Sequence, residues 1–562
     1  MNASKVSNAR KLLRCSEGAF NRARRLRVSA VLLALALVVS SATPLTAQTF
    51  RGSILGTVTD LQGSVVAGAT ITAKNIATGI QRTTVTDDVG NFEIPELPVG
   101  PYEVSVQATG FKVARVTDVR VEVASERRVD VELKVGGRET VETIDIRADA
   151  VQVESTTNTL GGTIQAKAVE DLPVNGRDFT KFLVLVPGAT GDPSGATDSP
   201  GSFGLFSANG NRGRSNNYLL DGTDMNDGYR NLPAINEAGV FGTPATILPV
   251  EAIAEAAILA NFEAEYGRNS GAVVNIVTKS GTNEFHGSAF WYFRDDKLDA
   301  RNYFNPKPDT QTDFRNQQVG FAAGGPIRRN KTFMFSAFEG QVERVGLNSV
   351  ARVPDPREIT ALGGPSNPVI RDLLARNPWP APNRPVPLFD PTPNLFVTTP
   401  ADNTVSSFIF KLDHSFNENN QLTGRYFFGD SDQSFPLAIL AGNVLPGFNT
   451  VTPTRVQLIS LSYLKVFSPD QINEARFGYN RFKENFFPED RNFDPRTIGL
   501  NTGIQGPQDF GLPLIRIRND PDLGASIASI GSTLSVPRGR VDTNWHFIDN
   551  FTWKLSRHQI KA

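Results

Sequence analysis

The residue types that most often catalyse reactions or bind metals are scarce in this chain, and their spacing fits no known chemistry. The chain has 562 residues, with 4 histidines and 1 cysteine, Cys15. No histidine begins a His-x-x-Glu or His-Glu-x-x-His pattern, which a zinc hydrolase needs. The four are His286, His414, His546 and His558. There is also no Gly-x-Ser-x-Gly, Walker A or Gly-x-Gly-x-x-Gly motif. The sequence therefore predicts no catalytic residue, no metal ligand, no cofactor and no enzyme activity.

One acidic segment, Asp221–Asp227, superficially resembles a metal-binding loop. Its order, Asp-Gly-Thr-Asp-Met-Asn-Asp, spaces carboxylates as a calcium loop does. It lacks the Gly and Glu positions of an EF-hand, so we interpret it as a polar turn. Arg177, Arg212 and Arg214 could line a polar lumen, although a solvated surface is the default interpretation for each of them.

The overall composition narrows the class of protein. The chain has 57 Lys and Arg against 58 Asp and Glu, a formal net charge of -1, so no global field attracts nucleic acid. Hydrophobic residues make up 40% of the chain, too few for a bundle of membrane helices. A membrane β-barrel is compatible with this value, because its lumen-facing polar residues alternate with lipid-facing ones. The 48 glycines and 36 prolines favour many turns, and the 37 phenylalanines favour strands.

Residues 1–47 are predicted to be a secretory signal peptide. Basic residues precede the apolar run Val28–Val39, and Ala47 offers a small residue at the cleavage point. The basic residues are Arg22, Arg24, Arg25 and Arg27. The alternative is a membrane anchor, but the apolar run is shorter than the about 20 residues that a helix needs to span a bilayer. The chain is therefore expected to be exported.

Residues 48–135 are predicted to form a small β-sandwich. Apolar and polar residues alternate, as over Tyr102–Val106, and turn-forming residues such as Asp87–Asn91 separate the candidate strands. The run TDDVGNFEIPELPVGPYEVSVQATGF (86–111) resembles the carboxypeptidase regulatory-like domain. That resemblance implies a transthyretin-like or immunoglobulin-like sandwich of a carbohydrate-binding-like superfamily, and it implies no peptidase activity.

Strand candidates of about ten residues with one aromatic face recur over residues 284–562. Near the middle of this region, Phe410 and Leu412 would face lipid while Lys411 faces a lumen. A soluble all-β sandwich also has alternating strands, but the number of aromatic residues and the strand length favour the membrane. Two proline-rich segments, 353–400 and 431–455, are expected to be long loops on the extracellular side.

Residues 158–283 carry short motifs in a fixed order. Asn175–Phe179 reads NGRDF, Leu219–Gly222 reads LLDG, and Glu265–Asn283 reads EYGRNSGAVVNIVTKSGTN. In this order they resemble the plug and the plug-to-barrel junction of TonB-dependent outer-membrane receptors. The closest resemblance is to the Oar-like branch, which carries an N-terminal carboxypeptidase regulatory-like domain.

The resemblance implies a mainly β fold class for the whole chain. After the signal peptide come the sandwich at 48–135, a linker at 136–157 and an α+β plug domain at 158–283. Residues 284–562 would form the first part, about eight strands, of a large antiparallel transmembrane β-barrel.

The predicted linker contains a segment that resembles a TonB box. It reads Glu142-Thr143-Ile144-Asp145-Ile146-Arg147-Ala148. An extended stretch with alternating β-branched residues can add a strand to a partner's sheet. The alternative interpretation is a last strand of the sandwich or a plain spacer. The resemblance implies TonB, with its inner-membrane energising complex, as a partner.

The function that the resemblance implies is TonB-dependent active transport across the outer membrane. The solute would be large or scarce, such as an oligosaccharide, a siderophore or a peptide, and the sandwich would lie in the periplasm. Asn209, Arg212 and Asn217, on plug loops, are the candidate solute contacts. The alternative is an exported or outer-membrane carbohydrate-binding or adhesion protein without transport. The expected partners are TonB, outer-membrane lipid and an extracellular solute, for which a glycan is one option.

The expected number of strands is smaller than this type of transporter uses. Such transporters close as plugged barrels of about 22 strands, whereas the residues after 284 supply about eight. An open sheet edge in lipid leaves backbone groups unpaired at several kcal/mol each. We therefore expect this sequence to be a C-terminally truncated form of a longer receptor.

Overall fold

The computed structural model describes most of the chain after residue 50. The described residues are 51–136, 141–145, 161–171, 177, 179–191, 206–236, 238–240, 243–260, 262, 266, 270–301, 311–436, 444–517, 527–533, 536–555 and 558–562. The predicted signal peptide at 1–47 and the end of the TonB-box-like segment, 146–148, lie outside them.

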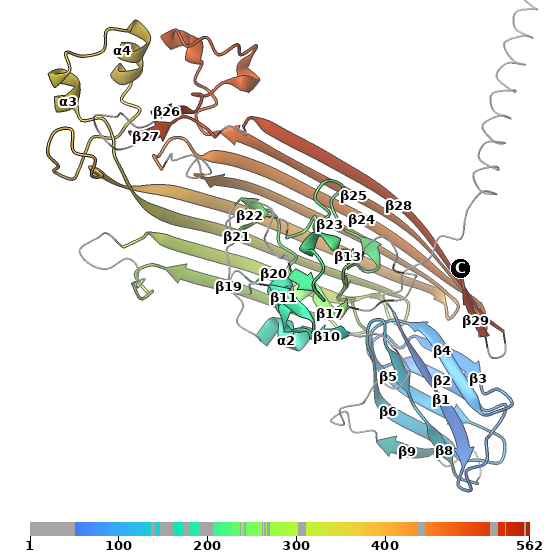
Figure 1. Ribbon diagram of the computed structural model, residues 1–562. Helices are drawn as coiled ribbons and strands as arrows, with labels where there is room; N and C mark the ends of the chain where they lie inside the picture. The colour runs from blue at the N-terminus through green and yellow to red at the C-terminus, as the bar shows by residue number, and fades with distance from the viewer. Residues whose placement is uncertain are drawn as a thin grey trace, which may run out of the picture.

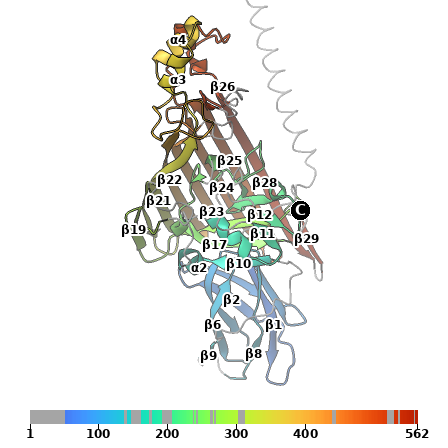
Figure 2. The ribbon, with the colours of Figure 1, turned by 60° about the vertical axis from the view of Figure 1, so that its left-hand side comes forward.

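Strands dominate the described residues, as the sequence predicted (Figure 1). A sandwich, in blue, lies at one end of a long sheet that runs from yellow-green to red, and a central domain, in green, lies against that sheet. Helices α3 and α4 mark a cap at the opposite end, and the turned view in Figure 2 shows the same order from sandwich to cap. Within the described residues, no helix is long and apolar enough to cross a membrane.

The sandwich consists of two packed sheets. One has the order β4-β1-β7, with β8 also paired to β1, and the other has the order β3-β2-β5-β6-β9. The strands are β1 (Gly52–Asp60), β2 (Thr70–Asn75), β3 (Gln81–Val85), β4 (Asn91–Leu97), β5 (Gly100–Gln107), β6 (Val113–Val121), β7 (Glu126–Arg128), β8 (Val131–Leu133) and β9 (Val141–Asp145). Alternating apolar residues such as Ile71, Val104 and Val116 are buried between the sheets, which confirms the predicted sandwich.

The TonB-box-like segment begins inside this sandwich. Its first residues, Glu142–Asp145, lie in β9, and β9 pairs in parallel with the stretch Ala114–Thr117 of β6. β9 ends the sheet order, so among the described residues nothing pairs with its outer edge. The backbone thus follows the alternative interpretation, a last sandwich strand, and the role of this segment toward TonB stays a prediction.

The central domain, residues 161–278, is built on a mixed sheet with the order β10-β17-β18-β13-β14. Its elements are β10 (Gly161–Gln165), α2 (Ala166–Asp171), the 3-10 helix η2 (Phe179–Leu185), β11 (Ala189–Gly191), β12 (Phe206–Ala208), η3 (Gly213–Ser215), β13 (Asn217–Leu220), β14 (Thr223–Asp224), β15 (Ala238–Val240), β16 (Thr243–Pro244), η4 (Val250–Ala252), β17 (Ile253–Leu259) and β18 (Val273–Thr278). β18 is buried along its whole length. One face packs on the sandwich through Val277 and Val123, and the other carries Val274 into a core shared with the long sheet.

The long sheet is an antiparallel meander with the order β19-β20-β21-β22-β23-β24-β25-β28-β29. Its strands are β19 (His286–Asp295), β20 (Phe314–Arg328), β21 (Thr332–Ala351), β22 (Leu395–Asn417), β23 (Asn420–Phe435), β24 (Thr450–Ser468), β25 (Gln471–Pro488), β28 (Arg538–Leu555) and β29 (His558–Lys561). Phe410 and Leu412 are exposed on the outer face, whereas Lys411 is 4% exposed on the inner face. This confirms the alternation predicted from the sequence.

The strands of this sheet are longer than the about ten residues that we predicted. β21 has 20 residues and β22 has 23. As a result, both predicted loops are shorter than expected, because β22 starts within 353–400, and β23 and β24 both extend into 431–455.

Prolines caused this error in the predicted loop boundaries. The segments 353–400 and 431–455 were interpreted as loops because they are rich in proline, but Pro400 and Pro453 pair with Gly346 and Asp432 inside long ladders. A proline removes one donor from a ladder, and neighbouring pairs on both sides hold the strand in register here. The strands therefore continue well past the length needed to cross a bilayer.

The segments between these long strands fold into a cap. Its elements are α3 (Pro356–Ala361), α4 (Pro368–Ala375), the 3-10 helices η7 (Pro495–Ile498) and η8 (Pro507–Asp509), β26 (Ile515–Ile517) and β27 (Ile527–Ile530). Val353, Leu373, Leu445, Ile498 and Ile530 come from separate segments and form one buried cluster. The predicted loops thus contain an ordered core of their own.

Candidate functional site

One loop of the central domain lies against charged side chains on the inner face of the long sheet. We call residues 220–227 the anchor loop; it contains the segment that we interpreted as a polar turn. Around it, Ile409, Phe427 and Phe482 of the sheet share a hydrophobic core with the central domain. The anchor loop adds polar contacts to this apolar contact surface.

Asp221 makes the most buried of these contacts. Its carboxylate lies 2.8 Å from Arg425 Nη1 and 3.5 Å from Lys411 Nζ, and all three side chains are buried. The Thr278 amide and hydroxyl also donate to it, at 2.8 and 2.7 Å. Burial alone would raise the pKa of Asp221, but Lys411 and Arg425 hold it below its ordinary value. Asp221 therefore remains an anion between two cations of β22 and β23.

The next residue links three parts of the molecule. The Gly222 carbonyl accepts a hydrogen bond from Arg476 Nη1 of β25 at 2.9 Å. Arg476 pairs with Glu474 at 2.6 Å, and Glu474 also lies 3.7 Å from Arg51 Nε of the sandwich. A single buried carboxylate thus connects the sheet, the anchor loop and the sandwich.

The far end of the anchor loop is held by β28. Arg540 Nη1 lies 2.7 Å from Asp227, and its Nε lies 3.1 Å from Glu484 of β25. The Asn226 carbonyl accepts from Asn480 at 3.0 Å and from Asn544 at 3.2 Å. The loop is therefore fixed at both ends to four strands of the sheet, β22, β23, β25 and β28.

Arg177 forms a separate contact with the sheet. Its guanidinium lies 2.5 Å from Glu251 of the central domain and 3.2 Å from Glu339 of β21, over the rings of Phe290 and Tyr292. The default interpretation of Arg177 as solvated surface was wrong, because only the tertiary structure brings Glu339 to it.

These buried ion pairs determine the position of the anchor loop more than they increase the free energy of unfolding. Desolvation offsets most of the attraction in a buried pair, but removing one partner leaves an unpaired charge and costs about 3–5 kcal/mol. A small displacement of the anchor loop would separate several pairs at once. The set therefore fixes the anchor loop against the sheet, and we call these ion pairs the lock.

The three predicted solute contacts lie close together in the sequence but differ in exposure. Asn209 and Arg212 are exposed, whereas Asn217 is fully buried on β13. Within the described residues, the Asn217 side-chain amide has no hydrogen-bond partner. Solute contact by all three stays a prediction, and Asn217 would first have to be uncovered.

Sequence reasoning missed the anchor loop, although part of the signal was present. Basic residues occur at inner-face positions of four strands of the sheet, as Lys411, Arg425, Arg476 and Arg540 do. An acidic loop elsewhere in the chain is their natural partner. The segment does turn at residues 221–222, but its ion pairs with the sheet were not predicted because the loop was considered alone. Within the described residues, no group of three or more His, Cys, Asp and Glu side chains could hold a metal ion.

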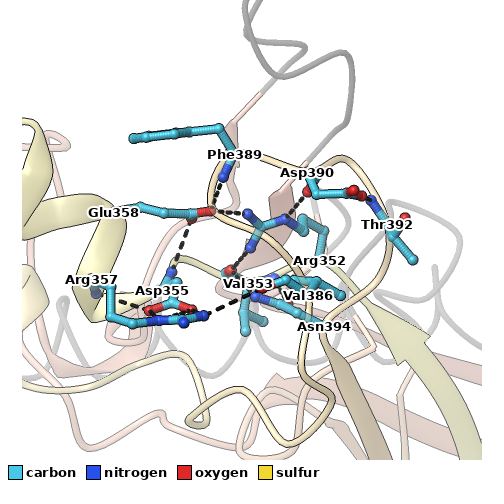
Figure 3. Close-up of polar contacts among 10 residues, drawn as sticks. All are labelled: Arg352, Val353, Asp355, Arg357, Glu358, Val386, Phe389, Asp390, Thr392 and Asn394. Carbon is cyan, nitrogen blue, oxygen red and sulfur yellow. Dashed lines mark hydrogen bonds and ion pairs between the residues drawn. The ribbon is translucent and has the colours of Figure 1, made fainter.

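A second buried ionic group lies at the base of the cap (Figure 3). Arg352 is ion-paired with Glu358 and donates to the carbonyls of Val353 and Asp390, at 2.6 and 2.9 Å. Glu358 also accepts from the Phe389 amide at 2.7 Å. The network joins α3 to the loop before β22, so it orders the cap.

Two parts of the chain match known protein families. Residues 277–562 match the family model described as outer membrane beta barrel domain. The chain belongs to this family of outer-membrane β-barrels. Residues 53–134 match the carboxypeptidase regulatory-like domain, as predicted from the sequence. The long sheet is thus barrel wall in the outer membrane, and its exposed aromatic face is the lipid face.

Two curated relatives are TonB-dependent proteins. The chain is 30% identical over 330 residues to the TonB-dependent transporter Oar of Myxococcus xanthus, covering 56% of this chain and 29% of that protein. It is 28% identical over 192 residues to the probable TonB-dependent siderophore receptor PirA of Acinetobacter baumannii, covering 33% and 23%. The chain thus spans less than a third of these relatives. The predicted Oar-like resemblance is confirmed.

One solved structure that the chain resembles is that of the outer membrane transporter YddB from Escherichia coli. It is 10% identical, with a TM-score of 0.45, over 70% of this chain and 45% of that one.

Proposed function

We propose that this protein transports a large or scarce solute across the outer membrane, driven by TonB. In this proposal the central domain is the plug, and the solute is an oligosaccharide, a siderophore or a peptide. The short turns of the sheet, which face the sandwich, would be periplasmic, and the cap would be extracellular. TonB would act through the segment 142–148.

The anchor loop is the observation that carries this proposal. A plug must hold firmly in the resting state and release under force. Asp221, Gly222 and Asp227 meet the wall through charged and polar contacts. Water can replace such contacts when they separate, whereas an apolar surface would gain no partner from water.

The edge position of β9 supports the role proposed for TonB. The segment 142–145 is extended and lies last in its sheet. Sheet edges are templates for added strands, and peptide recognition by strand addition uses main-chain hydrogen bonds. TonB could therefore recognise this segment with few side-chain requirements.

The first test asks whether TonB engages the segment. Thr143→Cys is mixed with the purified periplasmic domain of TonB that carries one cysteine, and disulfide-linked complexes are resolved on a gel. We expect a cross-link at position 143 and none with the control variant Thr157→Cys. Equal cross-linking of both variants would refute the assignment of the box.

The second test asks whether the protein transports. Cells with and without the deletion of 142–148 are given radiolabelled ferric siderophores, oligosaccharides and peptides. We expect the deletion to reduce uptake of one of these classes to the level of a strain without TonB. If the deletion changes no uptake while surface binding of labelled glycan persists, the protein is an adhesion or binding protein instead.

A further inference from the structure

The sandwich contacts successive periplasmic turns of the barrel wall. Gln81 Nε2 lies 2.8 Å from Glu418 at the β22–β23 turn, and Lys554 Nζ of β28 lies 3.2 Å from Glu93. At the β20–β21 turn, the position of a Cβ on Gly79 would be 2.3 Å from the side chain of Asn330. The sandwich therefore spans the rim from β20 to β28.

One contact in this set is deeply buried. Arg51 Nη1 donates to Gln421 of β23 at 3.3 Å, and its Nε lies 3.7 Å from Glu474 of β25. Arg51 is 4% exposed and Glu474 is 1% exposed. Separation of the sandwich from the wall would leave this pair to water, so the contact distinguishes a docked from an undocked state.

The sandwich also covers the periplasmic face of the central domain. Val99 and Val123 pack against Ala254, Ala257 and Val277 of the central sheet in one apolar cluster. The sandwich is thus attached to the plug and to the wall at the same time, and it bridges the seam between them.

A cavity of about 410 Å³ lies at this seam. Its walls come from β18 and from the periplasmic ends of β19 to β23, and sandwich loops 75–80 and 98–102 line it from below. We call this cavity the chamber. Lys411 lines it, and Lys411 contacts Asp221 of the anchor loop. The chamber therefore begins where the lock between plug and wall ends.

The chamber has unused hydrogen-bonding capacity. Gln421 and Asp413 line it, and the Gln421 Nε2 and Asp413 Oδ2 atoms are buried without a hydrogen-bond partner in the described structure. A buried donor and a buried acceptor on the wall of this cavity suit a polar molecule in transit. They have little use in a sealed structural interface.

We propose that the sandwich is the periplasmic gate of the barrel. It closes the chamber in the resting state, and it must leave the periplasmic turns before a solute can pass. The requirement for passage rests on the proposed transport function, whereas the closure of the chamber does not. In this proposal the carboxypeptidase regulatory-like domain closes the chamber, and it does more than separate the segment 142–148 from the plug.

Closure can be tested with a single thiol in the chamber. Cys15 is the only cysteine in the sequence, so a Cys15→Ser background has no other thiol. In that background, Ser415→Cys places a thiol on a chamber residue that is 7% exposed, and Asn419→Cys places one on the exposed turn nearby. A membrane-impermeant maleimide is then applied to outer-membrane fragments that contain the full chain.

We expect the labelling rate at position 415 to be lower than that at position 419 by a factor on the order of ten or more, because the thiol at 415 reacts only during local opening. Arg51→Ala should bring the rate at 415 close to that at 419. Arg128→Ala removes an exposed pair within the sandwich and should change nothing. Equal rates in the parent chain, or a rate at 415 that stays slow after undocking, would overturn the proposal.

Arg51 is buried, so Arg51→Ala can also disturb folding. A second variant that undocks the sandwich is therefore needed. Gln81→Ala with Lys554→Ala removes two contacts at the rim and should also accelerate labelling at 415, with an unchanged melting temperature. If the labelling rate at 415 in both variants correlates with a lower melting temperature, and not with the loss of the rim contacts, the gate proposal is also wrong.

The need for opening is tested by locking the gate. Gln81→Cys with Glu418→Cys is joined by a bis-methanethiosulfonate cross-linker, and uptake of the labelled siderophores, oligosaccharides and peptides is measured. We expect uptake to stop on cross-linking and to return on reduction. Persistent uptake by the cross-linked protein would refute the gate and leave the transport function intact. If no variant takes up solute, the transport proposal fails, and the labelling rates still decide whether the sandwich closes the chamber.

Discussion

At the scale of single residues, Asp221 is the centre of the lock between the central domain and the barrel wall. Asp221→Ala leaves Lys411 and Arg425 buried without their anion, which should destabilise the docked central domain by about 3–5 kcal/mol. Thermal unfolding and protease release of the central domain measure this loss. Asp88→Asn, on an exposed turn of the sandwich, is the matched control and should have no effect.

A double substitution tests whether these residues act as one unit. Asp221→Ala with Arg425→Ala should cost less than the sum of the single changes, because each single change leaves a charge unpaired. A coupling free energy of about 0.5–3 kcal/mol is expected for residues in direct contact. Strict additivity would contradict the proposed lock.

A second residue, Glu255, should make sandwich docking depend on pH. Glu255 of the central domain accepts a hydrogen bond from the Val123 amide of the sandwich at 3.0 Å. The pKa of Glu255 is raised from 4.5 to about 8, mainly by burial; the Val123 amide and Arg120 oppose this shift, and the nearby Glu122 adds to it. Since the docked state favours the protonated acid, its contribution is full below pH 4.5 and is lost as pH rises through 8.

This dependence can be measured as the change in melting temperature between about pH 5 and pH 9. Over this range, ionisation of Glu255 can lower the free energy of unfolding by at most about 5 kcal/mol. The melting temperature of the parent protein should fall across this range more than that of Glu255→Gln. Glu132→Gln, at an exposed position, should follow the parent curve. Parallel curves for the parent and Glu255→Gln would show that Glu255 is not the group responsible.

At the scale of elements, the cap is held by one buried ion pair. Glu358→Ala leaves Arg352 buried and unpaired, and should destabilise α3 and the adjoining loop by about 3–5 kcal/mol. Hydrogen exchange should rise in the cap and stay slow in β21 and β22. Arg357→Ala removes a neighbouring pair in which the arginine is largely exposed, and should cost under about 1 kcal/mol.

The turn from the central domain into the long sheet depends on Gly281, because it has no side chain. A Cβ on Gly281 would lie 2.3 Å from the Met334 carbonyl and 2.6 Å from the Gly325 carbonyl. Gly281→Ala should therefore push β20 and β21 apart and cost about 1–3 kcal/mol. For Gly228→Ala the nearest atom is at 3.4 Å, so that control should leave the melting temperature unchanged. An equal effect of both substitutions would contradict the close approach.

At the scale of the whole molecule, the sandwich and the central domain differ in how they are stabilised. The apolar core of the sandwich contains only residues of the sandwich itself. The core of the central domain includes Phe335, Ile409, Phe427 and Phe482 from the barrel wall. The two parts should therefore behave differently when separated from the barrel.

A fragment of residues 48–145 should unfold cooperatively on heating, with a stability on the order of 5 kcal/mol. A fragment of residues 158–283 should show no cooperative transition, because its largest core partners are missing. Circular dichroism measures both transitions. A cooperative transition in the second fragment would show that the barrel wall contributes little to the central domain.

The sequence by itself determined that the chain is built mainly of strands and which side of a strand is apolar, but not where the long strands end. Alternation has a period of two residues, so it can be recognised in any short segment such as Phe408–Asp413. The ordered motifs from Asn175 to Asn283 were sufficient for the family. These features are local, and they need no knowledge of what lies beside them.

Only the tertiary structure decided which residues meet across the chain. Asp221 and Arg425 lie 204 positions apart, and Arg51 and Gln421 lie 370 apart. The same holds for the pairing of β9 with β6, and for the long strands through Pro400. Pairing over such distances depends on the register of whole sheets and on the docking of domains, which short-range patterns do not specify.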